Sequence, residues 1–89
     1  MFETVINDKT YKVQFAHIGT PAPTGTICII KDSAEEVLAF GESRAHPRDQ
    51  FCRNTGRKLS LARALKQLGI PAEERACFWQ SYYNLIGHW

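Results

Sequence analysis

Cys52 and His46 are the residues whose types could support covalent chemistry, and they lie six positions apart in the stretch HPRDQFCRN. A Cys–His pair can act as a nucleophile and its general base. A working pair also needs a third group to orient the base, and nothing in the sequence places one. The alternative is a small buried thiol beside a histidine in a turn. We therefore expect no catalytic residues, and we expect that the protein is not an enzyme.

Metal binding is a second chemistry that the residue types could support. The residues that could act as soft or imidazole ligands are His17, Cys28, His46, Cys52, Cys77 and His88. No two of them have the close spacing of structural zinc ligands, and the odd number of cysteines contains no CxxC pair. The glycine-containing stretch GTPAPTG lacks the lysine and the following helix of a phosphate-binding loop. We expect no metal site, no cofactor and reduced thiols, as in a cytoplasmic protein.

Positive charge is concentrated in residues 44–66, which hold seven Arg or Lys residues and one acid, Asp49. The segment therefore carries +6, whereas the whole chain carries only +2. Such a run can be a solvated helix face, a surface for an acidic protein partner, or a phosphate-binding surface. Arg57 lies one turn before Leu61, so we expect it to be structural and paired with Asp49. The residues predicted to bind a partner are Arg48, Arg53, Lys58, Arg63 and Lys66.

The elements that must position this segment begin with strands in the first half of the chain. The stretch TYKVQFAHI alternates in polarity, which is typical of a half-buried strand. A tight turn at Asn7-Asp8-Lys9 should join it to the strand FETVI, since Asn and Asp tolerate the left-handed conformation. The predicted strands are 2–6, 10–18, 26–31 and 35–45. In the last of them, Leu38 and Phe40 share a face, and Gly41 indicates a bulge or the close approach of another backbone.

The sequence pattern of the second half of the chain predicts helices. Pro47 suits the start of a short helix over 47–54. A continuous helix to Leu68 would turn Lys58 into its leucine stripe, so we expect a break at Thr55-Gly56 and a helix over 57–68. Pro71 then starts another helix, with a wide apolar arc, that ends before Gly87.

Strands followed by helices predict an α+β fold, in which an antiparallel sheet of about four strands is packed by two or three helices. The length of 89 residues suits a single domain, 1–89. Leu61, Leu65, Leu68, Trp79 and Tyr83 are expected to be buried against Phe15 and Phe40. We find no signal peptide and no apolar run of about 18 residues, so we expect a cytoplasmic protein with no membrane contact.

One segment resembles a known group of proteins. The residues that carry the resemblance are Gly41, Ala45, Pro47, Asp49, Phe51, Gly56, Arg57, Arg63 and Ala64. They stand in GESRAHPRDQFCRNTGRKLSLARAL, which is similar to a pattern of short bacteriophage proteins. The similarity covers about 24 residues of the chain and carries no catalytic role.

The resemblance implies a function through binding, because small phage proteins of this type are often inhibitors of host machinery, with anti-CRISPR proteins as the best-known class. We therefore expect a phage-encoded inhibitor that binds a bacterial defence complex, such as a CRISPR–Cas effector, and blocks its surface. The alternative is a small nucleic-acid-binding regulator that uses the basic segment 44–66. Free nucleic acid is the less favoured partner of the two.

Overall fold

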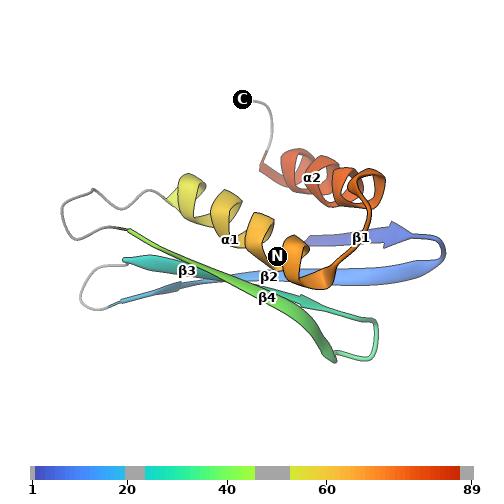
Figure 1. Ribbon diagram of the computed structural model, residues 1–89, viewed down its shortest axis with the longest axis horizontal. Helices are drawn as coiled ribbons and strands as arrows, with labels where there is room; N and C mark the ends of the chain where they lie inside the picture. Colours follow the sequence, from blue (N-terminus) through green and yellow to red (C-terminus); the bar gives the residue numbers. More distant parts are fainter. Residues whose placement is uncertain (1, 20–23, 46–52, 87–89) are drawn as a thin grey trace.

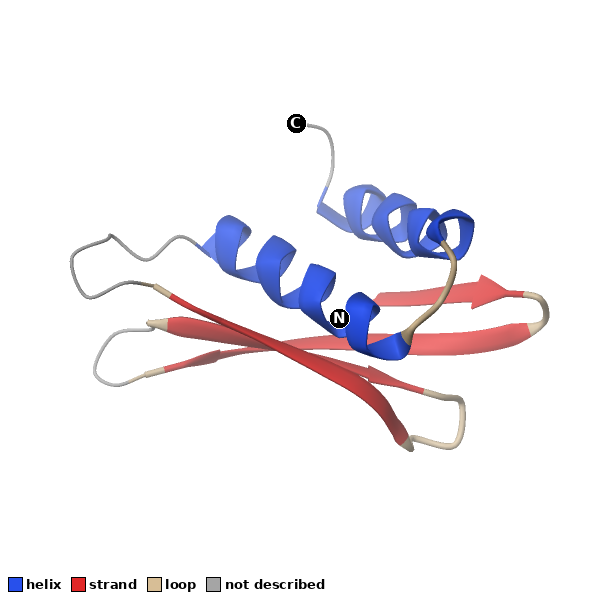
Figure 2. Cartoon of the chain, in the orientation of Figure 1, coloured by secondary structure: helices blue, strands red, loops and turns tan. Residues whose placement is uncertain are grey.

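The computed structural model describes residues 2–19, 24–45 and 53–86. Its elements are β1 (Phe2–Ile6), β2 (Lys9–Ile18), β3 (Gly25–Lys31), β4 (Val37–Arg44), α1 (Arg53–Leu68) and α2 (Ala72–Ile86). The strands form one antiparallel sheet in the order β1-β2-β3-β4, and both helices lie on the same face of it (Figures 1 and 2). The predicted α+β fold with a four-stranded antiparallel sheet is confirmed.

The turns between strands follow from local side-chain chemistry. Asn7 and Asp8 have φ values of 52° and 65°, so the β1–β2 hairpin turns through the left-handed conformation as predicted. At the β3–β4 turn, Asp32 Oδ1 accepts hydrogen bonds from the backbone N–H of Ala34 (2.9 Å) and of Glu36 (3.0 Å). The carboxylate therefore stabilises this turn in the way that Asx turns do.

The core lies between the sheet and the two helices. On the α2 side, Phe78 and Tyr82 are fully buried, with ring centroids 5.4 Å from Tyr11 and 5.9 Å from Phe15 respectively. The buried apolar core consists of Phe2, Ile6, Val13, Cys28, Ile30, Leu61, Ala64, Leu65, Phe78 and Tyr82. Ser81 Oγ donates to Thr4 Oγ1 at 3.0 Å, and this bond joins α2 to β1.

The contact of β4 with α1 depends on small residues. Ala39, Gly41 and Ser43 face the helix and are buried. A Cβ on Gly41 would lie 2.2 Å from the Ser60 carbonyl oxygen and 2.4 Å from the Ala64 nitrogen, so α1 rests directly on the β4 backbone. Of the two alternatives expected for Gly41, a bulge or a close backbone approach, the structure shows the close approach.

The predicted inward face of β4 is wrong. Phe40 is 55% exposed and Leu38 is 41% exposed, because the opposite face of the strand supports α1. A helix this close to the strand has room for Ala, Gly and Ser side chains but not for Leu and Phe. Small residues therefore occupy the buried positions of β4, although hydrophobicity alone would favour Leu38 and Phe40 there.

The predicted break in the helix at Thr55-Gly56 is also wrong, since α1 continues without interruption from Arg53 to Leu68. Gly56 is buried, and its carbonyl oxygen accepts a hydrogen bond from Ser43 Oγ at 3.0 Å. Here glycine permits a close helix–strand contact and does not end the helix. Lys58 avoids the core, because its Nζ lies 5.9 Å from the ring centroid of Tyr83 at the protein surface. Residues 47–52 of the predicted short helix lie outside the described residues.

The C-terminal end of α1 and most of the helix register agree with the sequence. Gly69, at φ 74°, ends α1 with its N–H bonded to the Leu65 carbonyl oxygen. Leu61 and Leu65 are buried as predicted, whereas Leu68 and Trp79 are only partly buried. The expectation for Tyr83 is wrong: it is 38% exposed, because Phe78 and Tyr82 form the inner stripe of α2.

Candidate partner-binding surface on the helix layer

Helix α1 carries all the described residues that we predicted to bind a partner. Between Arg53 and Leu68 it has five Arg or Lys residues and no acid, and its first turn contains no Asp or Glu. The five are Arg53, Arg57, Lys58, Arg63 and Lys66. Arg48, the fifth member of the predicted set, and Asp49, the predicted partner of Arg57, lie outside the described residues. The positive charge thus gathers on one helix, although its members point in different directions.

Arg63 points toward the free edge of β4. One of its guanidinium nitrogens donates to the Glu42 carbonyl oxygen at 2.6 Å. One turn further along α1, Gln67 Oε1 accepts the Phe40 N–H at 2.8 Å. These two side chains satisfy backbone groups that an edge strand otherwise offers to another strand. Arg63 therefore has a structural role that its place in the sequence did not reveal.

Arg57 and His17 lie near one another on the inner side of the N-terminal half of α1. Arg57 is partly buried and donates to Asn54 Oδ1 and, at 3.4 Å, to the Tyr82 hydroxyl. Burial lowers the pKa of His17, and the nearby positive charges of Arg53 and Arg57 lower it further. Its Nδ1 lies 3.0 Å from the Thr26 hydroxyl. A lowered pKa keeps this imidazole neutral at pH 7, so it adds no charge to the surface.

Arg53, Lys58 and Lys66 are the other described residues that we predicted to bind a partner. Arg53 and Lys66 are exposed, and Lys66 lies in the last turn of α1, where a cation is favoured by the helix dipole. Lys58 reaches toward α2 and contacts the face of Tyr83. Such cation–π contacts contribute about 0.5–1 kcal/mol at exposed sites.

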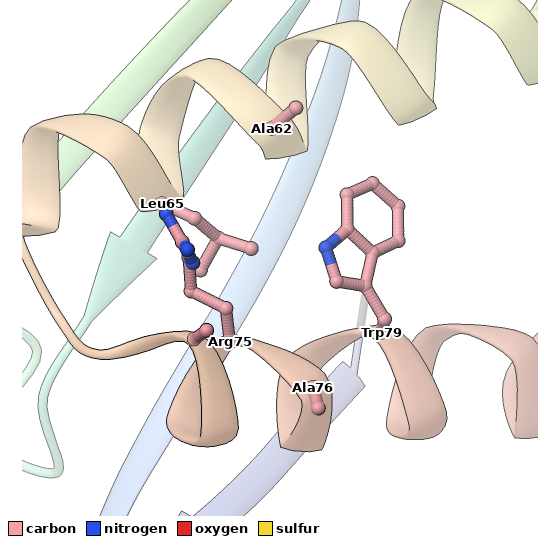
Figure 3. A pocket seen from close by; sticks show the side chains of 6 residues that line it. Ala62, Leu65, Arg75, Ala76 and Trp79 are labelled. Atoms are coloured by element: carbon pink, nitrogen blue, oxygen red, sulfur yellow. The ribbon is translucent and has the colours of Figure 1, made fainter.

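A groove of about 390 Å³ lies between the two helices. It is lined by Ala62, Leu65, Ala72, Arg75, Ala76 and Trp79. Figure 3 shows Ala62 and Leu65 on α1 and, across the groove, the Trp79 ring extending from α2 into the space between the helices. Three of the six lining residues are alanines, and their small side chains leave this space open.

Trp79 belongs to a group of aromatic rings that contact one another near the protein surface. Its ring is stacked on Tyr83, with centroids 6.2 Å apart and an interplanar angle of 29°, and meets buried Tyr82 edge-on at 6.0 Å. Tyr82 anchors the group in the core, so Trp79 and Tyr83 are held in place before any partner arrives. Aromatic side chains that are fixed in this way lose little conformational entropy on binding.

The thiols differ sharply in their surroundings. Cys28 is fully buried, and burial raises its pKa to about 12, whereas Cys77 is exposed on α2. The predicted pair Cys52 and His46 lies outside the described residues. Among the residues that the structure describes, no three His, Cys, Asp or Glu side chains are grouped in a way that could hold a metal ion.

The Cys28 thiol should resist alkylation in the folded protein, because the thiolate is the reactive form. At pH 8, iodoacetamide should modify Cys77 within minutes and Cys28 only after unfolding, as measured by peptide mass spectrometry. The pKa also predicts a pH effect: the unfolded thiol ionises near pH 9 and the folded one only near pH 12. Its contribution to stability is therefore complete below pH 9 and is lost as the pH rises toward 12. Rapid labelling of Cys28 in the native state would contradict this assignment.

None of the helices in the described parts of the chain is long and apolar enough to cross a membrane. The helix layer offers two features that could recognise another molecule: the α1 cations and the groove with its aromatic wall. The chain has no match among protein-family models, curated proteins or solved structures.

Proposed function

We propose that this protein is a bacteriophage-encoded inhibitor of the anti-CRISPR class, which acts in the host cytoplasm. It binds an acidic protein surface of a CRISPR–Cas effector complex and blocks that surface by occupying it, without catalysing a reaction. The resemblance of residues 41–64 to short phage proteins supports the class of protein. The chemistry of the helix layer supports the mode of action.

The observation that carries the proposal is the position of an acid-free cationic helix beside a groove with a preformed aromatic wall. Protein interfaces use Trp, Tyr and Arg as their main energetic anchors, surrounded by charges that select the partner. Trp79 and Tyr83 supply the anchors, and Lys58, Lys66 and Arg75 supply the charges around them. A partner that presents carboxylates around an apolar side chain would complement both features.

Charge reversal of Lys66 should weaken binding to the captured target at least about tenfold, because a rim cation would then repel acidic residues. The first measurement is affinity capture from host lysate with the tagged protein, followed by binding measurements on the captured complex. Lys66→Glu and Trp79→Ala should both reduce capture. Lys9→Glu makes the same charge change at an exposed position in the β1–β2 hairpin and should leave capture unchanged.

The biological readout is phage plating on a host whose CRISPR system targets that phage. Expression of the wild-type protein should restore plaques, and Lys66→Glu and Trp79→Ala should reduce them relative to Lys9→Glu. Equal loss in all three variants, or capture that is indifferent to Lys66 and Trp79, would contradict the proposed surface. Failure to restore plaques on any targeted host would contradict the anti-CRISPR class.

The absence of acids from α1 also favours a second candidate, a small nucleic-acid-binding regulator. Contacts to several phosphates weaken steeply with salt, because each contact releases counterions. A mobility-shift titration on random duplex DNA and on RNA at two salt concentrations separates the candidates. Under the inhibitor proposal we expect little binding at about 0.15 M salt. Submicromolar binding at that salt, with a steep salt dependence, would favour the regulator.

A further inference from the structure

The groove between α1 and α2 combines an apolar lining with a single charge. Of the six described residues that line it, five are apolar and the sixth is Arg75. In Figure 3, Arg75 and Trp79 both extend from α2 toward α1, with Ala76 between them. The groove can therefore take up apolar side chains while Arg75 binds a carboxylate beside them.

The cations of this region are not neutralised within the part of the chain that the structure describes. The side chains of Arg75 and Lys66 form no hydrogen bond or ion pair with a described residue. Lys66 follows Ala62 of the groove by four residues on α1, and residues with this spacing are neighbours on a helix surface. Five cations on α1, and Arg75 against Glu73 and Glu74 on α2, give the two helices a net charge of +4. Charge complementarity therefore calls for carboxylates opposite both helices.

The lining offers almost no hydrogen-bond partners to a polypeptide backbone. Apart from the first turn of α2, the backbone groups of both walls bond within their own helices. Among the five apolar lining residues, only Trp79 has a polar side-chain atom, its indole N–H. An extended segment that entered the groove would leave its own N–H and C=O groups buried without partners, which is unfavourable for each group. An α-helix satisfies these groups internally, so it avoids that loss.

We propose that the groove binds an acidic amphipathic α-helix of the partner protein, which lies between α1 and α2. The inference rests on the proposed function, because it names the structural element through which the target is recognised. Apolar side chains of this helix enter the groove against Trp79 and Leu65. Carboxylates on the two sides of its apolar stripe pair with Lys66 on one wall and Arg75 on the other.

The dimensions of the groove agree with this occupant. Ala72 and Trp79 are seven residues apart on α2, which corresponds to about 10 Å along the helix axis. The i and i+7 residues of a bound helix have the same separation, and helices recognised in apolar grooves use i, i+3, i+4 and i+7 as anchors. Two turns of the partner helix therefore match the length of the groove.

Other occupants fit these observations less well. A second copy of this chain would have to present α1, which has no acid, or α2, whose described acids are both in its first turn. A nucleic acid base could stack on Trp79, but the alanines and Leu65 offer nothing to its sugar and phosphate oxygens. The mobility-shift titration tests that occupant separately.

A peptide selection tests the proposal on the purified protein without knowledge of the target. The probe is a displayed library of random peptides of about 18 residues, which corresponds to five turns of helix. We expect the enriched sequences to have apolar residues at helical spacing, with Asp or Glu on both sides of the apolar stripe. Enriched sequences that alternate in polarity, are rich in proline or carry basic flanks would overturn the proposal. An absence of any peptide with a Kd below about 100 μM would overturn it as well.

A proline substitution shows whether the selected peptide binds as a helix. Proline at a solvent-facing position in the middle of the peptide should raise the Kd at least about 100-fold, because proline breaks a helix interior. Alanine at the same position should leave the Kd unchanged, and binding should increase the helical circular dichroism of the mixture above the sum of its parts. Equal binding of the proline and alanine peptides would contradict a helical occupant.

The two proposals can fail separately. Binding of the acidic helix in solution, with no plaques restored on any targeted host, would retain the groove as a helix site and reject the anti-CRISPR class. Capture of an effector complex that depends on Lys66 and Trp79, with selected peptides that bind in extended form, would retain the class and overturn the helix.

Variants of the protein locate the bound helix. Ala76→Phe fills the groove from an exposed position, so it should preserve the circular dichroism spectrum and raise the peptide Kd at least about 30-fold. Asn84→Phe places the same side chain at an exposed position of α2 outside the groove and should leave the Kd unchanged. Arg75→Glu should raise the Kd about tenfold, and a peptide with lysines in place of its flanking acids should recover most of that loss. Binding that is indifferent to Ala76→Phe, or that Asn84→Phe weakens equally, would overturn the groove as the site.

Discussion

Replacement of Gly41 by alanine should lower the free energy of unfolding by about 3 kcal/mol or more, although it adds only one methyl group. The added Cβ would lie 2.2 Å from the Ser60 carbonyl oxygen and 2.4 Å from the Ala64 nitrogen. Both are backbone atoms of α1, so no side-chain rotation can relieve the overlap and the whole helix must shift away from β4. For a domain of this size the melting temperature should fall by about 12 °C or more.

Gly69→Ala provides the matched control, because it makes the same substitution for a different physical reason. Gly69 has a φ of 74° and nothing lies within 4 Å of its would-be Cβ. The only cost there is the left-handed backbone conformation, about 1 kcal/mol. Chemical denaturation of the two variants should therefore show Gly41→Ala as much the more damaging. A loss at Gly41 no larger than that at Gly69 would contradict the close packing of α1 on β4.

Leu61→Ala should cost about 3–5 kcal/mol, the upper part of the range for buried leucines. Leu61 is fully buried on the face of α1 that meets the sheet. The close contact of α1 with the β4 backbone prevents the helix from moving inward to fill the space, so most of the cavity should persist. Urea unfolding monitored by circular dichroism measures the loss, and the slope of the transition should be unchanged.

Leu59→Ala is the control for this prediction because it lies on the same helix, two residues away. Leu59 is 44% exposed, so its truncation should change stability by less than about 0.5 kcal/mol. A large effect at Leu59 together with a small one at Leu61 would mean that α1 presents a different face to the sheet.

The sequence alone determined the class of fold and the positions of most of its elements. Alternation in TYKVQFAHI, left-handed residues at Asn7-Asp8 and the terminal Gly69 are local signals, and local backbone preferences decide them. The register of α1 was also readable, because Leu61 and Leu65 recur on one face of a helix. These features need no knowledge of what the element packs against.

Only the tertiary structure decided which face of β4 is buried and whether α1 is continuous at Gly56. Hydrophobicity favours Phe40 and Leu38 as inner residues, yet the distance between α1 and β4 admits only Ala39, Gly41 and Ser43. Both predictions failed because α1 lies very close to β4: only small side chains fit between them, and Gly56 serves that contact instead of ending the helix. Sequence reasoning cannot choose between a helix end and a close contact without the partner element.

For the candidate binding surface too, the sequence determined one part and the tertiary structure decided the rest. The sequence shows that positive charge is concentrated in residues 44–66. Only the structure shows that Arg63 binds the edge of β4, whereas Lys66 is exposed. The groove joins Ala62 and Leu65 of one helix to Ala76 and Trp79 of the other, residues with no common motif. Their meeting depends on how far apart the sheet holds the two helices, which is a property of long-range packing and of no local stretch of the chain.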